Sequence, residues 1–221
     1  MNDNVMQIMR NPVRVQSRGE EFANCISHGI SLLAVLIGTP FLLISASEQS
    51  SLQLLGTMVF SASAIFLYSS STIYHALPAG GTKHRWRMIE HSAIFVLIAG
   101  TYTPFTLGIL NGGLGWTLFG LVWGLAALGV SLKIFQRQSH PILSTCLYLL
   151  MGWLILFAID PLLMLMPLNG LIWLLAGGLF YTLGVIFFAT DSRLYYGHFI
   201  WHLFVMGGTT CHYFAILWYA T

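Results

Sequence analysis

Seven stretches of about twenty mostly apolar residues follow one another along this chain, which is the length that a helix needs to cross a bilayer. They run over about residues 22–45, 52–77, 89–110, 115–134, 142–164, 168–189 and 198–219. Lipid offers no partner to a free backbone N–H or C=O, so segments of this kind must form helices. The sequence therefore predicts an all-α integral membrane protein built as a bundle of seven transmembrane helices.

The scarcity of charge supports the same fold class. Only 7% of the 221 residues are charged, whereas a soluble domain typically carries about 25%, so this chain cannot cover a water-facing surface. Residues 1–21 are polar and lack the apolar core of a cleavable signal peptide. The breaks between the apolar stretches are too short to link two domains. We expect a short N-terminal segment, residues 1–21, and one seven-helix domain, residues 22–221.

The positive charges predict how the bundle is oriented. If the seven helices alternate in direction, every Lys and Arg falls on one side of the membrane: Arg10, Arg14, Arg18, Lys83, Arg85, Arg87, Lys133, Arg137 and Arg193. Cytoplasmic loops carry the excess of Lys and Arg in membrane proteins. We therefore expect a cytoplasmic N-terminus and an external C-terminus. Orientation also accounts for the net charge of +2, so no nucleic-acid partner is implied.

Two histidines stand at the inner end of the last apolar stretch. An ionisable group at membrane depth costs about 2.5–3.5 kcal/mol on insertion scales, so its presence points to function. In "HFIWH", His198 and His202 are four residues apart and share one helix face, from which two imidazoles can bind one metal ion. Taken alone, the pair is weak evidence for a metal site, because it also fits two interfacial histidines or two histidines that hydrogen-bond between helices.

Two other helices place polar groups at the same depth. His75 ends the second helix, with Ser71 one turn deeper on the same face, and Glu90 begins the third. A glutamate in a first helical turn also suits the helix dipole and can pair with Arg87. Together, three histidines and a carboxylate resemble a catalytic zinc site, which has three protein ligands and an open position. The nitrogen ligands suit zinc best, although ligand type also admits copper or iron.

The first helix adds a polar stripe at this end. Glu21, Asn24 and His28 in "EEFANCISHG" are three and four residues apart, so they lie on one face. One interpretation is a hydrated entrance to the helix. The other is a polar wall beside the metal, or a set of groups that orient its ligands.

The chain resembles the bacterial hemolysin III proteins, the prokaryotic branch of the progestin and adipoQ receptor family that includes the adiponectin receptors. The resemblance extends from about Glu20 to Tyr213 and rests on "EEFANCISHG", "SSSTIYHALP", "HSAIFVLIAGTYTPF", "YLLMGW" and "HFIWHLFVMGG". It implies a multi-pass protein of the bacterial plasma membrane with a cytoplasmic N-terminus and a metal site near the cytoplasmic face. It further implies a Zn²⁺ ion held by His75, His198 and His202, with the family serine at Ser71.

Position 90 departs from the family pattern. The resemblance implies an aspartate there that holds the zinc-bound water. Glu90 keeps the charge but reaches about 1.5 Å further. Three roles are open to it: positioning the water, binding the metal directly, or pairing with Arg87.

The leading functional hypothesis is a zinc-dependent intramembrane hydrolase of lipid amide or ester bonds, because the resemblance to the adiponectin receptors implies ceramidase-like chemistry. Zinc lowers the pKa of a water toward about 7, Glu90 would act as general base, and Ser71 would bind the water or the oxyanion. The expected partners are membrane lipids, one of them a substrate. The alternatives are a membrane homeostasis or sensor protein with structural zinc, and a hemolysin III-type cytolytic protein.

Overall fold

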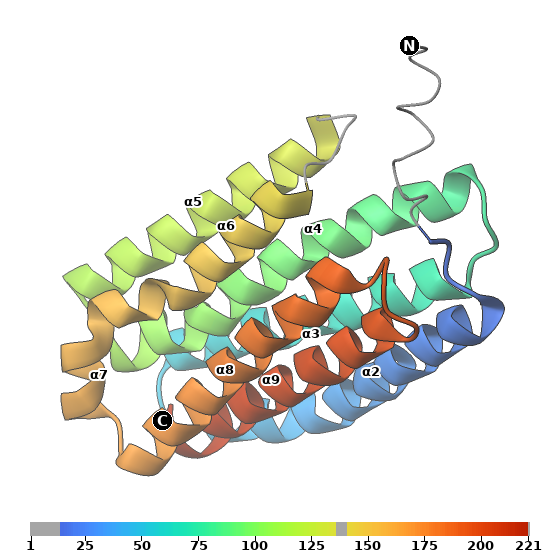
Figure 1. Cartoon of the computed structure of the whole chain (residues 1–221). Coiled ribbons are helices and arrows are strands. Elements are labelled where there is room, and N and C mark those ends of the chain that lie inside the picture. Colours follow the sequence, from blue (N-terminus) through green and yellow to red (C-terminus); the bar gives the residue numbers. More distant parts are fainter. Residues whose placement is uncertain (1–13, 136–140, 221) are drawn as a thin grey trace, which may run out of the picture.

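The computed structural model describes residues 14–135 and 141–220. Its helical elements are α2 (Arg18–Ser47), α3 (Ser51–Ala76), α4 (Gly81–Pro104) with the π-helix η1 (Phe105–Ile109), α5 (Gly113–Phe135), α6 (Pro141–Trp153) with the 3-10 helix η2 (Leu154–Ala158), α7 (Ile159–Leu165), α8 (Leu168–Thr190) and α9 (Gly197–Tyr219). They form seven spans that are long and apolar enough to cross a membrane (Figure 1). The predicted all-α fold with seven transmembrane helices is confirmed.

Helix α4 begins at Gly81, about eight residues before the predicted start. The turn before it ends at Gly80, whose φ of 154° lies in a region that favours glycine. In the first turn of α4, the Lys83 ammonium donates hydrogen bonds of 3.0 Å to the carbonyls of Tyr74 and Leu77 at the end of α3. These bonds satisfy backbone acceptors that the end of α3 leaves without partners, and they tie the first turn of α4 to that end.

The fifth span is interrupted, although the sequence predicts one helix over residues 142–164. The α-helix gives way to the 3-10 helix η2 before α7 resumes. The hydroxyl of Tyr102 on α4 donates to the carbonyl of Gly152 and accepts from the N–H of Ile155, at 2.8 and 2.9 Å. A side chain inserted in this way breaks the backbone ladder. Pro161, which has no N–H to donate, follows one turn later.

A change of helix type also lies at Pro104, the last residue of α4. The residues after the proline wind as the π-helix η1. The proline lies against α3 so closely that a Cβ on Gly56 would come within 2.7 Å of the Pro104 Cα. Only a glycine permits this approach of two backbones.

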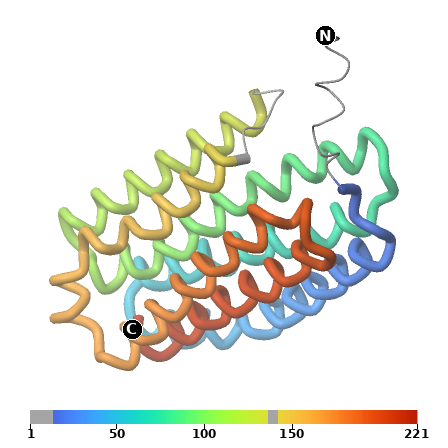
Figure 2. Tube along the Cα trace, viewed as in Figure 1, coloured from blue at the N-terminus to red at the C-terminus, as the bar shows by residue number. Residues whose placement is uncertain are grey.

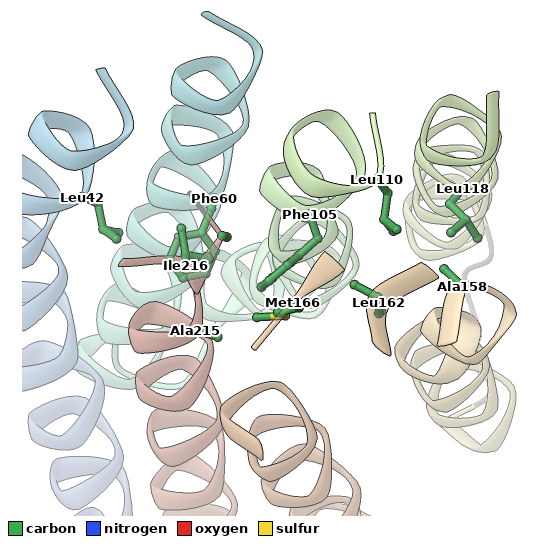
Figure 3. Packing of buried hydrophobic residues seen from close by; sticks show 11 residues of the cluster. Leu42, Phe60, Phe105, Leu110, Leu118, Ala158, Leu162, Met166, Ala215 and Ile216 are labelled. Carbon is green, nitrogen blue, oxygen red and sulfur yellow. The ribbon is translucent and has the colours of Figure 1, made fainter. Parts of the chain in front are cut away.

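The spans form a bundle in which α3 packs between α2 and α4, and α9 packs between α2 and α8, while α5 packs on the far side of α4 (Figures 1 and 2). The largest apolar cluster draws on most of these elements: Leu42, Phe60, Phe105, Leu110, Leu118, Ala158, Leu162, Met166, Ala215, Ile216 and Ala220 (Figure 3). It lies at the end of the bundle where α9 finishes. The opposite end, where α9 begins, carries a cluster of buried ionisable and polar residues that includes Glu20, Asn24, His75 and Glu90.

Candidate metal centre

Four buried side chains from three helices converge at the polar end of the bundle. His75 comes from the last turn of α3, Glu90 from α4, and His198 and His202 from the first two turns of α9. One potential ligand atom from each lies within 4.8 Å of the others. The fractional exposures of these four residues are 3%, 4%, 8% and 0% in that order. The structure thus brings together the three histidines and the carboxylate that the sequence singles out.

Each of the three imidazoles is held through one ring nitrogen. The Nδ1 atoms contact Glu21 Oε2 at 2.7 Å for His75, Asp191 Oδ2 at 3.1 Å for His198, and Ser27 Oγ at 3.0 Å for His202. Metal-binding histidines almost always donate their second ring N–H to such a partner, which fixes the tautomer and the ring orientation.

The other ring nitrogen of each imidazole is unsatisfied. The Nε2 atoms of His75, His198 and His202 are buried and have no hydrogen-bond partner within the described residues. Burying a polar atom without a partner costs free energy, and three such atoms at one place form an energetically costly cluster. A metal ion bound by the three nitrogens removes that cost, so the residues present fit a metal.

Glu90 points into this centre. Its Oε1 atom accepts a hydrogen bond of 2.7 Å from the Ser71 hydroxyl and lies 3.5 Å from His75 Nε2. Its Oε2 atom lies 3.9 Å from His91 Nε2 and has no hydrogen-bond partner in the part of the chain that the structure describes. Of the roles left open by the sequence, this geometry favours those at the metal over an ion pair with Arg87.

The polar residues Glu21, Asn24 and His28 on α2 make two kinds of contact with the centre. Glu21 binds His75 directly, and the Asn24 amide lies 3.5 Å from the same Nδ1 atom. His28 makes no such bond: its ring stacks on His202 with 3.5 Å between ring centroids, and both its nitrogens lack partners among the described residues. Glu21 therefore holds the ring of His75, Asn24 lies beside the same ring, and His28 packs against His202.

Two residues that hold imidazoles were missed by sequence reasoning. Ser27 lies three residues after Asn24 on the same face of α2, so helical spacing could have included it. Asp191 directly follows α8, in the short break between the last two predicted spans. No sequence pattern predicts that the carboxylate of Asp191 contacts His198.

A cavity of about 350 Å³ adjoins the centre. Glu90 and His28 line it at the polar end, and Leu162 and Leu168 line it near the opposite end of the bundle. Between these ends its walls come from α4, α6, α8 and α9, and are mostly aliphatic and aromatic. Its size and its apolar walls with a few polar groups are typical of ligand sites.

Comparison with known proteins gives one consistent result. Residues 16–213 match the family model described as Haemolysin-III related. The chain is 43% identical over 201 residues to the Hemolysin-3 homolog of Bacillus subtilis (strain 168). This match covers 90% of this chain and 94% of that protein. It is 41% identical to Hemolysin-3 of Bacillus cereus, over 90% of this chain and 91% of the relative. It is 27% identical to the human monocyte to macrophage differentiation factor, and the match covers 89% of this chain and 83% of that protein.

Proposed function

The chain belongs to the haemolysin-III related family of seven-helix membrane proteins, and from this premise we propose that it is a zinc-dependent hydrolase of lipid amide or ester bonds. One observation carries the proposal. Three buried imidazole nitrogens without partners meet a carboxylate at the end of an apolar cavity. This combination supplies a metal-binding set, a base and a chamber for an apolar substrate.

His75, His198 and His202 would hold the ion, and three histidine ligands suit zinc better than the hard cations that prefer oxygen. When bound, zinc supplies Lewis acidity and lowers the pKa of a water toward about 7. The polar end of the bundle also carries basic side chains: Lys83 lies 3.0 Å from Glu21, which binds His75. Because positive charge favours the cytoplasm, we place the centre at the cytoplasmic face.

Glu90 is positioned to act as the general base. Oε2 would accept a proton from the attacking water as its oxygen bonds to the substrate carbonyl carbon. When the C–N bond of an amide or the C–O bond of an ester breaks, Glu90 would return that proton to the leaving nitrogen or oxygen. Ser71 donates to Oε1 and so fixes the carboxylate. This contact favours a positioning role for Ser71 over direct binding of the oxyanion.

The cavity indicates the substrate class. A lipid acyl chain would lie along its apolar walls, with the scissile bond at the polar end beside Glu90 and His28. The route from the bilayer to such a chamber requires no passage through water. Membrane lipids are therefore the proposed partners.

Glu90→Gln tests the catalytic assignment. The variant keeps the size of the side chain and removes the base, so we expect zinc content to be unchanged and hydrolysis of lipid amides to fall by about 10²–10⁴-fold. His84→Ala, which removes an exposed histidine of α4, serves as the control and should retain both properties. Turnover at the wild-type rate by Glu90→Gln would exclude the proposed base.

A second function is favoured by the compactness of the cluster. Glu90 lies in the same 4.8 Å group as the three histidines, so four protein ligands can close a tetrahedral site. Closed zinc sites are structural, whereas catalytic ones keep an open position. A non-enzymatic membrane homeostasis or sensor protein would use such a site. In that case Glu90→Gln would weaken zinc binding, and the wild-type protein would turn over no lipid.

A further inference from the structure

A second buried carboxylate has no part in the proposed chemistry. Glu20, in the first turn of α2, is 2% exposed. It forms a two-pronged ion pair with Arg14, with Nη1–Oε2 and Nη2–Oε1 distances of 2.6 Å each. Its oxygens also accept from the backbone N–H groups of Ser17 at 2.9 Å and Tyr196 at 2.8 Å. The last of these bonds joins the start of α2 to the start of α9.

Arg14 also contacts the loop between α8 and α9. Its Nη2 atom donates to the carbonyl of Leu194 at 2.8 Å, and its guanidinium lies 4.4 Å above the ring of Tyr195. The hydrogen bond to Glu20 raises the pKa of Arg14, so the guanidinium stays charged. Bidentate pairs of this kind fix geometry as well as adding energy. Arg14 and Glu20 together therefore hold the α8–α9 loop, residues 191–196, against the N-terminal segment.

The backbone of that loop is under strain at Tyr196. Its φ of 57° is positive, which is otherwise found only at glycines within the described residues. A non-glycine residue in this region is unfavourable by itself and persists only where its surroundings hold it. The Glu20 carboxylate supplies such a restraint, because it accepts the N–H of Tyr196 itself. Tyr196 is also the N-cap residue of α9.

The loop connects directly to the metal centre at both of its ends. Asp191, at its start, contacts Nδ1 of His198. Tyr196, at its end, precedes the first turn of α9, which carries that histidine. A displacement of the loop would move the carboxylate and the imidazole relative to each other.

We propose that Arg14 and Glu20 are positioning residues, which form a latch that holds the α8–α9 loop and thereby sets how tightly the centre retains its metal. The inference rests on the proposed metal centre and extends it to residues that touch neither metal nor substrate. It also gives the segment before the first span a role, since Arg14 lies outside the spans.

The test measures zinc affinity by competition with a chromogenic chelator on the purified full chain in detergent. Asp191→Asn should weaken binding by about 10–100-fold, the usual effect of changing a partner of a metal-binding histidine. Glu20→Gln and Arg14→Gln act one step further away and should each weaken it by about 10-fold. Arg18→Gln makes the same charge change at an exposed residue of the same segment and should leave the affinity unchanged.

Combining variants separates positioning from general stabilisation. If the latch acts through Asp191, then Glu20→Gln should cause no further loss of zinc affinity in the Asp191→Asn background. A pair that merely stabilised the fold would lower the thermal stability of the metal-free protein and add its full effect in either background. Arg14→Gln alters a half-buried side chain outside the spans, so it keeps the test open if Glu20→Gln fails to fold.

The outcomes distinguish the two proposals. Zinc binding that is weakened by Asp191→Asn but unchanged by both Glu20→Gln and Arg14→Gln overturns the latch alone. Additive losses in the double variant also overturn it. Wild-type protein that binds no zinc overturns the proposed centre, and the latch with it.

Discussion

The second ring nitrogen decides what each histidine of the centre can do. Glu21, Ser27 and Asp191 occupy the Nδ1 atoms, which leaves the Nε2 atoms for a metal. Spacing along a helix predicts that side chains share a face, but not which nitrogen of a ring is engaged. The histidines themselves could therefore be identified from the sequence, and helical spacing could have added Ser27, whereas the contact of Asp191 with His198 follows only from the fold.

At the same scale, Ser71 is expected to matter through Glu90. Ser71→Ala removes a 2.7 Å hydrogen bond to a buried carboxylate. Hydrogen bonds to charged groups contribute about 1.5–3 kcal/mol, so turnover of lipid amides should fall by about 10–100-fold while zinc content stays constant. The matched control is Ser70→Ala, because the neighbouring Ser70 is equally buried and bonds only the carbonyl of Leu67. Equal rates for the two variants would contradict the positioning role of Ser71.

At the scale of elements, hydropathy predicts the seven spans well and their internal geometry poorly. The apolar runs are a property of local sequence, and each became a span. The break of the fifth span depends on the Tyr102 hydroxyl, which reaches it from α4. The first turn of α4 is tied to the end of α3 by Lys83. Contacts between elements decide both features, so a reading of local pattern could not predict them.

The latch also belongs to the element scale. Glu20 caps its own helix through Ser17, which follows from local sequence. Its bond to the N–H of Tyr196 joins residues 176 positions apart and follows only from the fold. One carboxylate thus fixes the start of two helices, and one of these helices carries two of the three histidines of the centre.

For the molecule as a whole, the bundle separates an apolar core at one end from a polar centre at the other, with the cavity running between them. A membrane protein with so few charges thus gathers four buried ionisable side chains at one place. Buried polar residues also occur away from this centre, among them Gln53, Thr57 and Ser61 on α3.

The cavity predicts a dependence on acyl-chain length. Gly178 of α8 lines it, and a Cβ at this position would meet nothing within 4 Å. Gly178→Phe should therefore fill the chamber without disturbing its walls, and should raise the KM for long-chain lipid amides more than for short-chain ones. Gly120→Phe is the control, because Gly120 of α5 is equally open but lies outside the cavity lining. If Gly178→Phe leaves the chain-length preference unchanged, the substrate's acyl chain does not lie in this cavity.

The most direct measurement is the metal content of the purified protein, determined by elemental mass spectrometry for the wild type and for His202→Ala. His202 is fully buried, and its Nε2 atom has no hydrogen-bond partner in the described part of the chain, so its loss should open the centre. We predict one zinc ion per wild-type chain and a loss of zinc from His202→Ala. A correctly folded wild-type protein that takes up no zinc, or a His202→Ala protein that keeps the full zinc content, would contradict the proposed centre.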